Sequence, residues 1–518
     1  MKKMLLMVVV LATSLTLATY GNECKAETKT AGPKRGGVLT VSQFTDPFNL
    51  NPMFHKADLH MNRIAYNLYD PLVDWDFEKK KLVPALAIKW YQKDPKTWIF
   101  KLRKGVQFHK GYGELTAEDV AFTVNYIIRK KTPSKFLFDF VKEAVVIDKY
   151  TVQYNLEQPH APFLLSAASG IAGRIVSKKA FEEKGVDAFN RDPVGTGPYE
   201  FVEWVPADHI TIKRFEGYLE KGKPYIDKII WKTVPAVYTA QTMLRTGQID
   251  FLPDPNFKDI KRLKKQENLE VQSTGGANWD YITFDCAKSP FDKKEVRQAI
   301  GYAIDRQAIV DAVYYGWADP DDDPLPSGYL GADPDIQVYP NRPDIAKAKE
   351  LLTKAGYPNG FETTIITSAK ENLRRATQIV AEQLKKIGIN VKVEQLDQAT
   401  YVKRVRGASD FKVELEDIGI MSMDPDSTFW WFHHSGTVRM HGHENPTTDK
   451  LLEQGRIEQD PVKRASIYQD ITRQILEESP YVYIAHVSAV NVYNKALKGY
   501  KITPLGNMLM FKDTWLDQ

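Results

Sequence analysis

The stretch FETTIITSAKENLRRATQIVAEQLKKIGINVKVEQL, residues 361–396, decides the fold class. Residues 361–367 are rich in β-branched side chains and predict a strand, and residues 372–387 carry apolar side chains at helical spacing. Gly388 provides a turn after the helix, and apolar residues then alternate from 389 to 393 as in a second strand. Strand, helix and strand in this order normally form a right-handed crossover between parallel strands. The stretch therefore predicts an α/β fold.

Start signals for two further helices lie N-terminal to this stretch. Thr116 is followed three positions later by Asp119, which is the pattern of a helix capping box. Asp292 and Glu295 show the same spacing, and a helical stripe of apolar residues follows them. We expect Asp292 to cap this second helix and Gly316 to end it.

Length and composition narrow the class of protein. The chain has 518 residues, of which 43% are hydrophobic and 26% charged, so it can build real cores and is not a disordered polymer. At roughly 100–200 residues per domain, this length suggests about three domains or large subdomains. A net charge of +4 is small for this size and argues against a nucleic-acid partner. Two cysteines cannot form a disulfide framework.

The N-terminus has the pattern of a secretory signal peptide. Lys2 and Lys3 precede an uncharged, strongly apolar run over 4–17, which is too short for a comfortable membrane span. We expect a signal peptide over 1–26, with cleavage after Ala26 and cleavage after Gly21 as the alternative, and therefore a periplasmic protein. Cys24 lacks the preceding residues that lipoprotein processing prefers, so we do not expect a lipoprotein.

Signatures of catalysis and of metal binding are mostly missing from the sequence. It contains no Gly-x-Ser-x-Gly, no phosphate loop ending in Lys-Ser or Lys-Thr, and no His-Glu-x-x-His, so we expect neither an enzyme nor a cofactor. Four histidines cluster at 433, 434, 441 and 443, and we interpret them as part of a polar surface loop without a metal. The alternative is a metal held by His441 and His443.

Longer motifs run along nearly the whole chain in a fixed order. They are WIFKLRKGVQFH at 98–109, DPVGTGPY at 192–199, LRTGQID at 244–250, VRQAIGYAIDR at 296–306, AGYPNG at 355–360 and DPD at 424–426. Any one of them alone is weak, but the ordered set, covering about 37–515, resembles the family-5 extracellular solute-binding proteins. These form the oligopeptide-, dipeptide- and nickel-binding group of ABC importers.

The resemblance implies a two-lobed periplasmic-binding-protein fold, type II-like, with mixed sheets and a two-strand hinge. Lobe I would comprise 27–283 and 489–518, with an extra subdomain at about 61–192. Lobe II would comprise 284–488. The hinge strands would lie near 281–284 and 485–488.

The same resemblance implies a function. The chain would be the receptor of an ABC importer that captures a peptide-like ligand in an interlobe cleft and delivers it to the transmembrane subunits of a permease. Two alternatives stay open. One is a receptor for another solute, such as an opine, a sugar or a nickel or metallophore complex, and the other is an exported enzyme. We expect a monomer.

Candidate ligand-binding residues lie at strand ends, because strands ending at a lobe interface present their last residues to the cleft. The first strand, 38–41, ends at such a place. The candidates are Ser42, Gln43, Phe44, Thr45, Asn278, Trp279, Ile420, Met421, Ser422 and Met423. Trp279 suits either packing beside the hinge or stacking on a ligand.

Position 421 departs from the peptide-binding members of the family. Those that capture a free α-amino group carry an aspartate in a run resembling Trp-x-x-Asp-x-x-Asp-Pro. With Asp424-Pro425 aligned on that run, the corresponding residue is Met421, which cannot pair with an ammonium group. A ligand without a free α-amino group is therefore plausible, with Glu416 or Asp417 as substitute acids.

Overall fold

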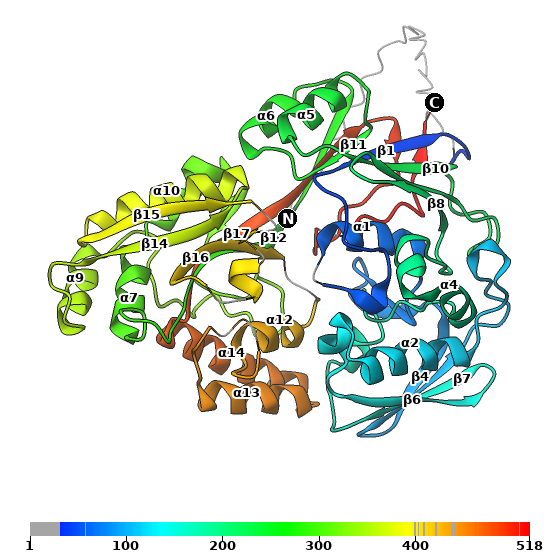
Figure 1. Ribbon diagram of the computed structural model, residues 1–518, viewed down its shortest axis with the longest axis horizontal. Coiled ribbons are helices and arrows are strands. Elements are labelled where there is room, and N and C mark those ends of the chain that lie inside the picture. The colour runs from blue at the N-terminus through cyan, green and yellow to red at the C-terminus, as the bar shows by residue number, and fades with distance from the viewer. Residues whose placement is uncertain are drawn as a thin grey trace, which may run out of the picture.

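The computed structural model describes residues 32–517, except 57, 398–399, 402, 408–409, 420–421, 438, 440 and 507. The predicted signal peptide, 1–26, lies outside the described residues, as do the candidate residues Ile420 and Met421. Figure 1 shows two bodies of mixed helices and strands that are joined by long strands near the top of the view.

A large mixed sheet extends through both bodies. In the described part of the chain it has eleven strands. In spatial order they are β15 (Ile389–Leu396), β14 (Phe361–Ser368), β16 (Val413–Gly419), β12 (Leu269–Phe284), β17 (Tyr481–Asn494), β11 (Phe251–Pro253), β1 (Val38–Gln43), β10 (Lys228–Thr233), β9 (His209–Arg214) and β8 (Tyr199–Val205), with β13 (Ala318–Pro320) paired to β17. β14 runs parallel to both β15 and β16, and β1 runs parallel to β10 and β11.

Among the described residues, the remaining strands form three smaller sheets. β4 (Ala87–Asp94), β5 (Thr97–Leu102), β7 (Thr151–Leu156) and β6 (Val141–Asp148) form an antiparallel sheet in that order. β2 (Val73–Asp76) pairs with β3 (Lys81–Pro84), and β18 (Leu497–Lys498) pairs with β19 (Trp515–Leu516).

The helices cover these sheets. They are α1 (Leu59–Leu68), α2 (Ala117–Lys130), α3 (Phe163–Ser166), α4 (Lys178–Arg191), α5 (Val237–Arg245), α6 (Ile260–Leu263), α7 (Lys294–Ala303), α8 (Arg306–Ile309), α9 (Ile345–Lys354), α10 (Glu371–Lys385), α12 (Pro425–His433), α13 (Pro446–Ile457) and α14 (Pro461–Glu478). Among the residues described, none of the helices has both the length and the apolar character needed to cross a membrane.

The predicted crossover is confirmed. β14, α10 and β15 occupy the stretch 361–396, and β14 and β15 pair in parallel from Phe361–Ile389 to Ser368–Leu396. The capping box of α2 is also present, because Thr116 Oγ1 accepts from Glu118 N at 3.3 Å and Thr116 N donates to Asp119 at 2.9 Å.

The helix predicted to begin at Asp292 is built differently. Its N-cap is Lys293, without a side-chain hydrogen bond, and α7 ends at Ala303 rather than near Gly316. Asp305 then caps α8 by accepting from Ala308 N at 2.9 Å. The apolar stripe continues across this break, which is why the sequence pattern alone suggested one helix.

Each body has its own hydrophobic core. One core is formed by residues between 39 and 251 together with residues between 493 and 516. The other is formed by residues between 282 and 487. β12 and β17 pair with each other and run from one body into the other, so they connect the two bodies (Figure 1).

The pairing of β12 with β17 is interrupted where the strands pass between the cores. Thr274 pairs with Ala489 and Asn278 with Val487, so the register shifts over the intervening residues. Gly276, within this interruption, has a φ of +54°, and a Cβ placed on it would lie 3.3 Å from the His486 Cβ. Only glycine adopts such a conformation readily, so Gly276 fixes the local path of the crossing strand.

We therefore expect Gly276→Ala to lower the free energy of unfolding by about 1–2 kcal/mol, because of the left-handed backbone and the tight contact. Urea unfolding followed by circular dichroism measures this difference. Gly275→Ala is the matched control: Gly275 has no left-handed φ, and a Cβ placed there meets nothing within 4 Å. Equal losses in the two variants would show that Gly276 has no special role.

Candidate functional site

The candidate residues of the first body lie at the end of β1. Ser42 and Gln43 belong to the strand and are buried, so β1 is two residues longer than predicted. Gln43 Nε2 donates to Thr233 Oγ1 of β10 at 3.2 Å. Phe44 and Thr45 follow the strand and are exposed. Only these last two present their side chains to solvent in this structure.

Asn278 and Trp279 lie on β12 beside the end of β16. Asn278 pairs with Gly419 and is partly exposed, whereas Trp279 is only 1% exposed. The Trp279 ring contacts Phe432 and Tyr483 edge-on, with centroids 5.6 and 5.4 Å away. Its indole Nε1 is buried, and no group in the described part of the chain accepts a hydrogen bond from it. Trp279 therefore packs in a core here, with one unsatisfied donor.

Ser422 and Met423 follow β16 and are partly buried. Ser422 Oγ accepts from Asp424 N at 3.1 Å, which orients the turn before α12. Met423 Sδ accepts from the Tyr329 hydroxyl at 3.7 Å. The neighbouring candidates, 420 and 421, are outside the described residues.

An aromatic cluster connects the two bodies near these residues. Its core includes Trp279 of β12, Phe432 of α12 and Leu505 from the C-terminal segment. Tyr66 of α1 and Met423 pack against this core. We call it the interlobe aromatic cluster. The structure therefore places Trp279 and Met423 in one cluster, whereas Ser42 and Gln43 lie on β1, in the part of the large sheet that belongs to the first body.

Two ion pairs at the same interface were missed by the sequence analysis. Arg63 of α1 donates to Asp254 at 2.5 Å, and Lys370, just before α10, donates to Asp417 of β16 at 2.6 Å. Arg63 is buried, but Asp254 and Lys370 are about half exposed. Lys370 also interacts electrostatically with Asp254, so charges of one body face charges of the other.

The surroundings of these groups shift the pKa values of His60 and Lys370. Burial, followed by the neighbouring Arg63, lowers the pKa of His60 to about 3. Desolvation by the surrounding protein opposes the charged form of Lys370, but Asp417 outweighs it and raises the pKa of Lys370 above its usual value. The interface therefore holds a neutral imidazole and a charged ammonium group at neutral pH.

Of the residues in these two ion pairs, the sequence pattern indicates the position of Lys370. Lys370 lies in the turn that follows the first strand of the predicted crossover, and ligands of α/β sheets gather at the carboxyl ends of such strands. Arg63 and Asp254 had no such signal, because they are 191 positions apart and the sequence does not reveal their pairing.

The histidine-rich loop is not the polar surface loop that we expected. His433 and His441 are buried, and His433 Nε2 lies 2.9 Å from the Tyr483 hydroxyl. Burial lowers the pKa of His441 to about 3 and that of His443 to about 4. Within the described ranges, no group of three or more His, Cys, Asp or Glu residues is arranged to hold a metal ion.

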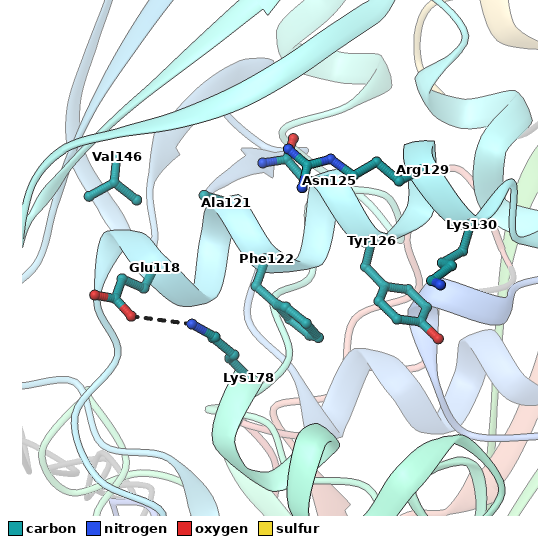
Figure 2. A pocket seen from close by; sticks show the side chains of 9 residues that line it. All are labelled: Glu118, Ala121, Phe122, Asn125, Tyr126, Arg129, Lys130, Val146 and Lys178. Atoms are coloured by element: carbon teal, nitrogen blue, oxygen red, sulfur yellow. Dashed lines mark ion pairs between the residues drawn. The ribbon is translucent and has the colours of Figure 1, made fainter.

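A groove of about 560 Å³ lies elsewhere, along α2 and the start of α4. Figure 2 shows Phe122 and Tyr126 one helical turn apart on α2, and Glu118 paired with Lys178. The groove is open and has charged residues on its rim. None of the ten candidate ligand-binding residues lines it. We therefore place the candidate site at the interface of the two bodies rather than in this groove.

Comparisons with known proteins give one consistent result. The family model described as bacterial extracellular solute-binding proteins, family 5, middle, matches residues 81–439. The dipeptide-binding protein of Escherichia coli K12 is 28% identical over 492 residues, which are 89% of this chain and 91% of that protein.

Two solved structures are similar over nearly their full length. The ABC transporter-associated periplasmic binding protein DppA of Helicobacter pylori, in complex with the peptide STSA, has a TM-score of 0.86 and 28% identity, and the match covers 94% of this chain and 99% of that one. AgaA of A. tumefaciens R10, in complex with agropinic acid, has a TM-score of 0.84 and 26% identity, with 93% and 99% covered.

The buried carboxyl group of Asp280 on β12 leads to a prediction about how stability depends on pH. Burial, followed by Asp417, raises the pKa of Asp280 to about 8, and the Tyr314 hydroxyl donates to its carboxyl group. In the unfolded chain the value returns to about 3.9. The stability that comes from the protonated form is therefore present below about pH 4 and is lost as the pH rises toward about 8.

Asp280→Asn mimics the protonated group, so its free energy of unfolding should exceed that of the wild type by an amount that grows between these pH values. The growth is at most about 1.4 kcal/mol per pH unit. Denaturant unfolding at pH 5, 6, 7 and 8 measures it, and the exposed Asp335→Asn is the control. A constant difference across this range would show that Asp280 is already ionised at pH 5.

Proposed function

The chain belongs to the bacterial extracellular solute-binding proteins of family 5, and from this we propose that it is the receptor of an ABC importer for a peptide-like ligand. It captures the ligand between its two bodies and delivers it to the transmembrane subunits of a permease. The observation that carries the proposal is the near-complete match, at a TM-score of 0.86, to a binding protein in complex with a peptide. The proposed protein is an exported, periplasmic monomer whose signal peptide, 1–26, is removed.

The proposed lobes are residues 27–283 with 489–518, including an extra subdomain at about 61–192, and residues 284–488. The separation of the two hydrophobic cores supports this division. Closure of such lobes around a ligand derives its affinity from contacts that only the closed form makes. The interruption between β12 and β17 is the proposed site of bending.

The proposed ligand contacts remain those expected from the sequence. They are Ser42, Gln43, Phe44, Thr45, Asn278, Trp279, Ile420, Met421, Ser422 and Met423. Trp279 supports this placement, because a ligand oxygen that reached its indole N–H would satisfy a buried donor that otherwise costs about 1–3 kcal/mol. Lys370 adds a half-exposed cation that suits the carboxylate of a ligand, with Asp417 as its partner in the unliganded protein.

A second candidate is a receptor for a solute other than a peptide. One solved relative binds agropinic acid, and the similarity extends over 93% of this chain. Met421 in place of an amine-pairing aspartate supports a ligand without a free α-amino group. Both candidates are binding functions, and the curated relatives are named as binding proteins, so we propose binding rather than catalysis.

Thermal unfolding and calorimetry with the peptide Ser-Thr-Ser-Ala and with agropinic acid test the two candidates. We expect the peptide to stabilise the protein by about 2.7 kcal/mol at 100 times its Kd. A shift with agropinic acid alone would favour the second candidate. No shift with either compound, or with mixed tri- to pentapeptides, would contradict the peptide proposal.

Lys370→Met should weaken binding of the free-acid peptide at least about tenfold, since a charge-assisted hydrogen bond to its carboxylate is lost. The same peptide with a C-terminal amide should bind wild type and variant alike. Lys385→Met is the control, because Lys385 is half exposed and pairs with Glu382 on the same helix. Equal loss for acid and amide would show that Lys370 acts on the fold rather than on the carboxylate.

A further inference from the structure

The two lobes meet a second time, away from the strands that join them. Arg456 of α13 reaches the first lobe in two ways: its Nη1 donates to Asp139 Oδ2 at 3.1 Å, and its carbonyl oxygen accepts from Ala161 N at 2.6 Å. Figure 1 shows α12 in the lower half of the view, close to the first lobe and away from the strands that join the lobes. This contact and the crossing strands therefore hold the lobes together from two sides.

Arg456 is itself fixed within the second lobe. Its Nε donates to Asp426 Oδ1 at 2.9 Å, and its guanidinium group lies 3.2 Å from the centre of the Trp430 ring. The side chain is only 5% exposed. A rigid, buried guanidinium group of this kind loses little entropy when it binds a partner across an interface.

His160, next to Ala161 in the first lobe, is enclosed by this contact. It is fully buried, stacks on Phe140 with ring centres 3.4 Å apart, and places Nε2 3.8 Å from Asp426 Oδ2. That distance is too long for a hydrogen bond, and within the described part of the chain neither ring nitrogen has a hydrogen-bond partner. The site therefore accepts His160 only as a neutral ring.

The charged groups around His160 already form ion pairs with one another. Asp424 caps the N-terminus of α12, and Asp426 lies in the first turn of that helix. α13 contributes Arg456, and α14 contributes Arg464, which binds Asp424 at 2.6 Å. Asp139, on the side of the first lobe, is partly exposed to solvent. Burial first, and then Arg456, hold the pKa of His160 well below its usual range.

We propose that Arg456 and His160 form an interlobe latch, which stabilises the closed form and opens when His160 binds a proton. The proposal goes beyond the proposed function and rests on its two moving lobes, but not on the identity of the ligand. Arg456 and His160 would thus change the fraction of closed protein, although neither is among the candidate ligand contacts.

The direction of the pH effect follows from proton linkage. When the lobes separate, α12 and α13 leave His160 and water reaches its ring, so its pKa returns toward about 6.5. The open form then binds a proton that the closed form excludes. Closure is therefore fully favoured above about pH 6.5, and the ratio of open to closed protein rises by up to about tenfold for each pH unit below it.

The distance between the lobes tests the latch without any ligand. Lys142→Cys on β6 and Val462→Cys at the start of α14 provide exposed positions for spin labels, in a Cys286→Ala background and after removal of carried ligand by dialysis from denaturant. Pulsed electron paramagnetic resonance then gives the distance distribution. We expect a short distance at pH 7.5 and a longer component that grows as the pH falls to 5.5.

Variants separate the latch from general acid sensitivity. Arg456→Met should increase the long component at least about tenfold at pH 7.5. Asp139→Asn, at a partly exposed site, should increase the long component less strongly. It replaces Arg456→Met in this test if that variant does not fold. His160→Asn should keep its distance distribution constant between pH 7.5 and 5.5, while the control His209→Asn, on β9, retains the response of the wild type.

A wild-type distribution that does not change with pH would overturn the proton switch, and so would a response retained by His160→Asn. Unchanged distances in folded Arg456→Met and Asp139→Asn at pH 7.5 would overturn the latch itself. Because no ligand is added, these results are independent of whether the protein binds peptides.

Discussion

The pairing of β12 with β17 is the constraint on which the rest of the structure depends. Both strands enter the core of the second lobe. In the first lobe β17 enters the main core, and Leu269 of β12 packs in a smaller cluster with Leu252 and Val492, so the two lobes are parts of one sheet rather than domains on a flexible tether. The ladder is interrupted between Thr274 and Asn278, where the strands pass between the two lobes. Bending at this interruption would cost few hydrogen bonds and would leave both cores packed, which is what a closing receptor requires.

The interface between the lobes differs from their cores in chemistry. The cores are apolar and dense, whereas the interface contains ion pairs, partly exposed carboxylates and buried donors without partners, such as the Trp279 indole. The stability of the closed form therefore depends on these groups, because a buried polar or charged group stabilises the interface only when it has a partner there. A ligand and a proton can therefore shift the same equilibrium from different places, the first near β12 and β16 and the second at α13.

How far the sequence could predict this structure depends on the range of the interactions involved. The crossover over 361–396 and the cap at Thr116 were predictable, because periodicity and capping act over a few residues. The break between α7 and α8 was not, because the apolar stripe continues through it and Asp305 competes locally as a cap. The pairs of Arg63 with Asp254 and of Arg456 with Asp139 join residues 191 and 317 positions apart, and no local pattern indicates such pairs. The candidate residues at strand ends were located by fold analogy, and the structure shows their surroundings rather than their ligand.

The central claim is that ligand binding closes the two lobes about the crossing strands. Small-angle X-ray scattering of the protein, first stripped of ligand and then saturated with a compound of calorimetrically measured affinity, tests it most directly. We expect a smaller radius of gyration and a shorter maximum dimension in the saturated protein, with unchanged mass. Identical scattering profiles for the two samples, with binding confirmed in the same solutions, would contradict it.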